Sequence, residues 1–181
     1  GEDKFWLDTF ARRLGDDFAG TRAVIPATPA ENRAYNIGGI TFQVILFDQA
    51  HTTTDLMVHV VEEDVLFTGD IVNNEHFSFM GDGNFKGAYA ATQQALAINP
   101  ERVVVGHGRS GDIELVQAFA RIYQQLRSVV AKYYEQGLMD YEMKPGVIAE
   151  LDEYKNWSGF ERQIGPYISQ LITELESESF E

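Results

Sequence analysis

The order of apolar and polar positions predicts a sheet in the first part of the chain. Short apolar runs of about four to eight residues, bounded by Gly, Asn, Asp or Pro, are typical of strands. Gly38-Gly39 divides one such run, "AYNIGGITFQVILFD" at 34–48, and predicts a hairpin. Further apolar strands are expected at 55–61, 65–69 and 102–106.

Apolar residues that recur every three or four positions predict helices before, within and after this sheet. Asp112 is an N-cap candidate for a long helix, and Gly137 stands where the chain is expected to leave it. Pro145 and Gly146 indicate a short connection before a small helix. The helices are expected at about 3–19, 86–98, 112–137, 146–154 and 160–176.

Together these elements predict an α/β fold. The expected helix at 86–98 lies between the strands at 65–69 and 102–106, which is the order of a βαβ-like unit inside a mixed sheet. Residues 1–111 are expected to form the α/β part of a single domain. The helices of residues 112–181 are expected to belong to the same domain and to cover one face of the sheet.

Composition and charge exclude several classes of function. The formal net charge is −14, from 14 Lys and Arg against 28 Asp and Glu. A field of this sign repels phosphate backbones and offers no basic surface to anionic lipid, so we expect neither a nucleic-acid nor a membrane partner. No apolar run approaches the roughly 20 residues that span a membrane. We expect a soluble protein with a small-molecule substrate, and its compartment, cytoplasm or periplasm, stays open.

The chain contains no cysteine, so a transition-metal site would have to use His, Asp or Glu. Three such residues, His51, Asp70 and His107, stand in loops at the ends of apolar strands. Their neighbours are threonines or glycines such as Gly69 and Gly106, which let the backbone turn tightly. Because α/β folds assemble sites at strand ends, these side chains predict a ligand set for Zn²⁺, Fe²⁺ or Mn²⁺. The alternative, for each histidine alone, is a structural role in its loop.

The stretch "HTTTDLMVHVVEEDVLFTGDIV" at 51–72, followed by "VVVGHG" at 103–108, resembles the second half of the metallo-β-lactamase-fold hydrolases. The resemblance implies the second sheet and flanking helices of a four-layered αββα sandwich. It also implies that His51 belongs to a first metal site, that His107 belongs to a second, and that the catalytic Asp70 bridges the two. The implied cofactor is a pair of zinc ions, with iron or manganese as alternatives.

One motif of that family is absent. The His-x-His-x-Asp-His motif supplies four further ligands, and the histidines of this sequence are His51, His59, His76 and His107. We therefore interpret the chain as the C-terminal part of a metallo-β-lactamase-like domain. Each metal would keep one histidine and the shared Asp70, whereas a tight zinc site takes three or four protein ligands. We expect the chain alone to bind zinc weakly or not at all, and to be inactive.

Three more polar residues have competing interpretations. Asp55 would either orient His51 as a hydrogen-bond acceptor or simply begin the following strand. His76 lies in a loop rich in aromatic residues, and would either line a substrate pocket or help to close that loop over the core. His59 lies inside a predicted strand, where packing or a hydrogen bond is favoured over metal binding.

The resemblance implies that the intact protein is a metal-dependent hydrolase of an ester, thioester, lactone, amide or phosphoester. The alternative is a non-catalytic binding or scaffold module with the same fold. Without the first half of the sandwich, the inner face of strands such as 40–47 and 56–61 would be open to water. Because exposed apolar surface of this kind associates, we also predict a homo-oligomer that forms through the exposed sheet face.

Overall fold

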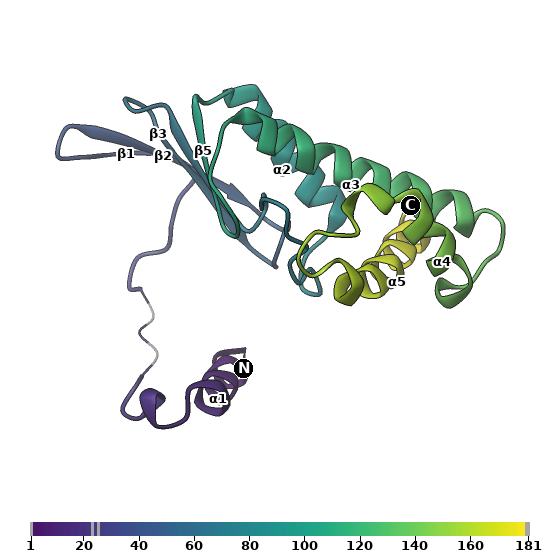
Figure 1. Ribbon diagram of the computed structural model, residues 1–181. Coiled ribbons are helices and arrows are strands. Elements are labelled where there is room, and N and C mark those ends of the chain that lie inside the picture. Colours follow the sequence, from purple (N-terminus) through teal and green to yellow (C-terminus); the bar gives the residue numbers. More distant parts are fainter. Residues whose placement is uncertain (1, 23, 25, 180–181) are drawn as a thin grey trace. The chain divides into compact units, whose positions relative to one another are not determined.

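The computed structural model describes residues 2–22, 24 and 26–179, which form two compact units, Gly1–Ala30 and Glu31–Glu181 (Figure 1). The first unit holds helix α1 (Glu2–Leu14) and a short 3₁₀ helix, η1 (Gly15–Phe18). The predicted helix at 3–19 is therefore confirmed, in two pieces. The break follows from Gly15, whose φ of +55° lies in the left-handed region that glycine adopts without steric cost.

The second unit is built on one mixed five-stranded sheet in the order β1-β2-β3-β4-β5. The first four strands pair antiparallel in sequence order, and β5 pairs parallel with β4. The predicted hairpin is confirmed, because Ile37 pairs with Ile40 across Gly38-Gly39. The strands are β1 (Ala34–Ile37), β2 (Ile40–Phe47), β3 (Asp55–Val60), β4 (Val65–Gly69) and β5 (Arg102–Val105).

Helix α2 (Phe85–Ile98) connects β4 to the parallel strand β5, which confirms the predicted βαβ-like unit. The helix begins where the Asn84 side chain accepts a hydrogen bond from the Gly87 backbone N–H. It ends at Asn99, a left-handed residue whose N–H donates to the Ala95 carbonyl. Both ends satisfy backbone groups that a helix otherwise leaves unpaired.

The C-terminal helices are α3 (Ile113–Tyr134), α4 (Asp140–Glu150), the 3₁₀ helix η2 (Asp152–Tyr154) and α5 (Phe160–Glu178). Asp112 is the N-cap of α3, as predicted. Helix α4 starts earlier than expected, however, and Pro145 lies inside it. The Glu142 carboxylate accepts a hydrogen bond from the Met139 N–H and so starts the helix, while Met143 and Val147 are fully buried. Packing and capping therefore outweigh the Pro-Gly signal.

The two faces of the sheet differ. Figure 1 shows the helices of the second unit on one side of it, and three of the side chains that point there, Met57, Leu66 and Val103, are completely buried. Cross-strand pairing places another apolar set on the opposite face, where Leu56 and Phe67 are 42% and 43% exposed. This set, the open face, consists of Phe42, Val44, Leu46, Leu56, Val58, Val60, Val65 and Phe67.

The predicted division between residues 111 and 112 falls inside the second unit, between β5 and α3, which are in contact. That division stays a prediction. Within the described residues, every helix is too short or too polar to serve as a membrane span.

Candidate functional site

The sheet topology brings the three predicted site residues to one edge. Strands β2 and β4 both run antiparallel to β3, and β5 runs parallel to β4. The carboxyl ends of β2, β4 and β5 therefore lie at the same end of the sheet, where the loops that follow these strands begin. His51 lies in the loop after β2, Asp70 directly follows β4, and His107 follows β5. Loops at such an edge are where α/β folds assemble sites.

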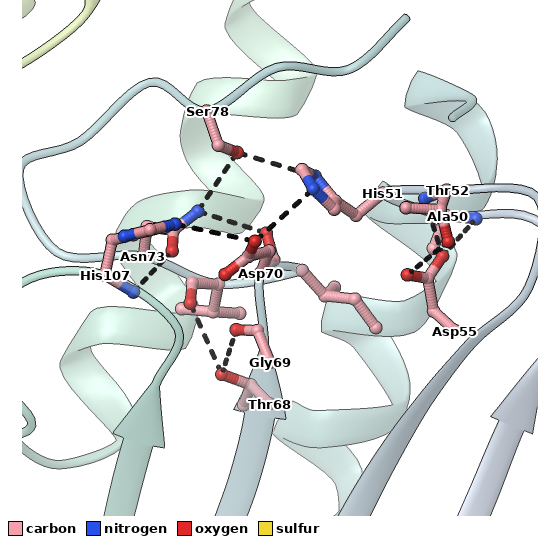
Figure 2. Close-up of polar contacts among 12 residues, drawn as sticks. Ala50, His51, Thr52, Asp55, Thr68, Gly69, Asp70, Asn73, Ser78 and His107 are labelled. Carbon is pink, nitrogen blue, oxygen red and sulfur yellow. Dashed lines mark hydrogen bonds and ion pairs between the residues drawn. The ribbon is translucent and has the colours of Figure 1, made fainter. Parts of the chain in front are cut away.

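The three side chains converge on one carboxylate oxygen. The Nε2 atom of His51 lies 3.5 Å from Oδ2 of Asp70, and the Nε2 atom of His107 lies 3.5 Å from the same oxygen. Figure 2 shows the two rings on either side of Asp70. The side chain of His51 is 12% exposed, and that of His107 is 51% exposed. The centre is therefore closed on the His51 side and open to solvent on the His107 side.

The Asp70 carboxylate lies close against the backbone at Gly106. A Cβ atom added to Gly106 would lie 1.8 Å from Asp70 Oδ1, so no larger residue fits at this position without moving the carboxylate. The Gly106 N–H also donates to the Gly69 carbonyl. The glycine before His107 thus allows the carboxylate and the β5 loop to approach closely.

Asp55 holds the turn that carries His51. Its Oδ2 atom accepts hydrogen bonds from the backbone N–H groups of Ala50 and Thr52, and its Oδ1 atom accepts one from the Thr52 hydroxyl. Both backbone donors are sequence neighbours of His51. The contacts of Asp55 are therefore with the turn on both sides of His51, so its carboxylate acts on the position of that residue through the backbone.

His76 lies beside the same centre. Its ring stacks on that of His107, with centroids 4.6 Å apart and an angle of 28° between the ring planes. A parallel β-bridge joins His76 to Ser158, just before α5. The segment between η2 and α5 therefore lies beside His76 at the edge of the site. His59 lies elsewhere, in β3, with its Nε2 atom 3.0 Å from Oδ1 of Asp64.

A model of the metallo-β-lactamase superfamily matches residues 3–107, which is more than half of the chain. The chain belongs to this superfamily. The match includes all three residues of the convergent centre and ends at His107.

Solved structures agree on the fold of this metallo-β-lactamase-superfamily chain. It is similar to a metallo-β-lactamase from Pontibacter korlensis, with 21% identity and a TM-score of 0.52 over 65% of this chain and 62% of that one. It is also similar to VMB-1, with 20% identity and a TM-score of 0.50 over 65% of this chain and 52% of that one. The chain thus spans 62% and 52% of these two lengths. No curated protein matches the sequence.

The donors fit part of a metal site. Two ligand atoms that are each about 2.1 Å from a tetrahedral zinc lie about 3.4 Å apart, which is close to both observed Nε2–Oδ2 separations of 3.5 Å. Nevertheless, among the described residues no group of three or more His, Asp or Glu side chains could hold a metal ion. The arrangement is best described as two histidine–carboxylate pairs that share Asp70. Each pair supplies two donors, and any further donors would have to come from elsewhere.

Burial favours the neutral form of two imidazoles of the site, those of His51 and His76. It lowers the pKa of His51, and the carboxylates of Asp70 and Asp55 oppose this effect. Burial also lowers the pKa of His76, and the nearby His107 and Arg162 lower it further. Because a metal binds the unprotonated ring nitrogen, the lowered pKa of His51 keeps it in its ligand form near neutral pH.

Sequence reasoning missed two residues, Asn73 and Ser78, which are both buried in the centre of the site. Asn73 donates to Ser78 Oγ, which lies 3.5 Å from Nδ1 of His51. The available signal was weak, because Asn73 and Asn74 are adjacent and identical, and their surroundings in the sequence do not show which one turns inward.

Proposed function

We propose that this chain carries part of the metal site of a metal-dependent hydrolase, with His51, Asp70 and His107 as ligands and Asp70 as the shared, catalytic carboxylate. The observation that carries the proposal is the approach of two imidazole Nε2 atoms to one carboxylate oxygen, at 3.5 Å each. Nitrogen and oxygen donors without a thiolate favour zinc, with iron or manganese as alternatives.

The residues of the chain have separate tasks in such a site. A divalent metal supplies Lewis-acid chemistry, because it lowers the pKa of water and stabilises the negative charge that develops on the substrate. Oδ2 of Asp70 lies 3.5 Å from the Nε2 atom of each imidazole, and its Oδ1 atom lies close against the backbone at Gly106. His51, which is nearly buried, excludes water from one side, and the more exposed His107 faces the side from which a substrate would enter.

Membership of the superfamily does not choose among ester, thioester, lactone, amide and phosphoester substrates, because the fold hosts many reactions. Two donors per metal are fewer than the three or four of a tight zinc site. We therefore expect the chain by itself to bind metal weakly and to show no hydrolysis.

A second candidate is a non-catalytic binding or scaffold module with the same fold. It is favoured by one observation, the absence of any three-residue metal-holding group among the described residues. The two candidates differ in whether the imidazoles of His51 and His107 bind metal at all.

The deciding experiment is a titration of the metal-free protein with Co²⁺, followed by absorption spectroscopy and by metal analysis after zinc loading. His51→Ala and His107→Ala should each weaken binding by about tenfold or more, because each removes one of two donors. His59→Ala is the matched control, since that ring contacts Asp64 and not Asp70. If all three variants and the parent bind Co²⁺ equally, the metal proposal is wrong and the scaffold candidate stands.

A further inference from the structure

Asn73 is a completely buried polar residue at the centre of the candidate site, with a relative exposure of 0%. Its side-chain amide uses both of its ends. The Oδ1 atom accepts a hydrogen bond from the His107 backbone N–H at 2.8 Å. The Nδ2 atom donates to the Asp70 carbonyl at 3.1 Å and to Ser78 Oγ at 3.2 Å. One side chain therefore contacts three different segments of the site.

Each contact leads to a different candidate ligand. The bond to the His107 N–H holds the loop after β5, and the bond to the Asp70 carbonyl holds the turn after β4. The bond to Ser78 reaches the third ligand indirectly, because Ser78 Oγ lies 3.5 Å from Nδ1 of His51. Figure 2 shows this chain of contacts from His107 through Asn73 and Ser78 to His51.

Ser78 is itself held from the other side. Its backbone carbonyl accepts a hydrogen bond from the hydroxyl of Tyr167, which is buried in α5. The position of Ser78 is thus set by a helix at the far end of the chain. Its hydroxyl oxygen has two lone pairs, so it can accept from Asn73 and also from the Nδ1–H of His51, which leaves Nε2 of that ring free to bind a cation.

We propose that Asn73 is the positioning residue of this site: it keeps the His51, Asp70 and His107 loops in register, and Ser78 relays its effect to the His51 ring. This proposal rests on the proposed function for its consequence, metal binding, but its structural half does not. Only an amide offers both an acceptor and two donor hydrogens at this place. A carboxylate keeps the acceptor and loses both donor hydrogens, and an aliphatic side chain loses the acceptor and both donors.

The first test needs no metal. Hydrogen exchange of the His107 backbone amide in the metal-free protein should be about tenfold faster in Asn73→Leu, because its acceptor is gone. It should remain slow in Asn73→Asp, which keeps the acceptor. Asn74→Ala is the matched control, since the Asn74 side chain donates to the Arg109 carbonyl of the same loop and not to the His107 amide.

The second test is Co²⁺ affinity. Ser78→Ala and Asn73→Asp should weaken it by about 10- to 100-fold, as is typical when a residue that orients a metal ligand is removed. Ser78→Thr keeps the hydroxyl and should retain most of the Co²⁺ affinity of the parent. Asn74→Ala should leave it unchanged.

The outcomes separate the two proposals. If the parent protein binds no Co²⁺, metal binding by this chain is wrong, and the exchange result alone decides the role of Asn73. If Asn73→Leu speeds exchange at His107 no more than Asn74→Ala does, or speeds it equally at β3 amides such as Val58, the positioning role is wrong. If Asn73→Leu does not fold, the Co²⁺ affinities of Asn73→Asp and Ser78→Ala decide the relay to His51. Affinities equal to that of the parent would contradict it.

Discussion

The imidazole of His76 lies stacked against the imidazole of His107, with 4.6 Å between the ring centroids. His107 has an exposed side chain, and stacking restricts its ring where the protein leaves it open to solvent. His76 in turn is fixed by its β-bridge to Ser158. The segment just before α5 therefore contacts the candidate site through this pair of rings.

Removing the stacking ring should loosen His107. His76→Ala should lower Co²⁺ affinity about two- to tenfold, because a ring pair contributes about 0.5–1.5 kcal/mol. His76→Phe keeps a flat ring in this place and should retain most of the affinity. Isothermal titration of the metal-free variants measures both. Equal affinities in the Ala variant and the parent would show that the stack has no effect on His107.

Gly106 is expected to accept no side chain. Gly106→Ala would place a Cβ atom 1.8 Å from Asp70 Oδ1, so either the carboxylate or the β5 loop must move. We expect a loss of about 1–3 kcal/mol in the free energy of unfolding, as for other overpacked positions. Gly165→Ala in α5 is the control, because its Cβ would meet only the flexible end of Lys144 at 3.4 Å. Urea unfolding compares them, and an equally stable Gly106→Ala would contradict the close approach.

Glu174 should make stability depend on pH in the acid range. Its carboxylate, on α5, accepts hydrogen bonds from the Phe85 and Lys86 N–H groups at the start of α2. Burial nevertheless raises its pKa above the ordinary 4.5, with these hydrogen bonds opposing the rise. The folded state then binds the proton more tightly than the unfolded state. The contribution of Glu174 to the free energy of unfolding therefore falls as the pH rises from about 4.5 through the raised pKa.

This sign is testable by urea unfolding of the parent and of Glu174→Gln at several pH values. The parent should lose free energy of unfolding relative to the variant as the pH rises through that window, and the difference should be constant above it. A difference that grows in favour of the parent over the same range would contradict the effect of burial.

The homo-oligomer stays a prediction, and the open face is where it should form. Leu56 and Phe67 lie on this face and are nearly half exposed. Light scattering should give a mass above that of one chain, and Leu56→Lys or Phe67→Lys should return it to the monomer. Tyr141→Lys, at a residue that is 70% exposed on α4, is the control and should not change the mass. A stable monomer at high concentration would contradict the prediction.

Local signals in the sequence determined most of the secondary structure. The hairpin at Gly38-Gly39, the βαβ-like unit and the Asp112 N-cap were all predictable, because periodicity, turn residues and caps act over a few positions. Placing His51, Asp70 and His107 at strand ends also needed only the order of the strands. Their roles as ligands were implied by the resemblance, and stay predictions.

Only the tertiary structure decided which polar residues support that site. Asn73 bonds to the His107 N–H, 34 positions away, and Ser78 reaches the His51 ring, 27 positions away. The start of α4 before Pro145 likewise depends on burial of Met143. Such contacts depend on which distant segments of the chain meet in the folded protein, and a local sequence pattern does not show this. The sequence by itself determined the elements and their order, and packing decided which side chains share the centre.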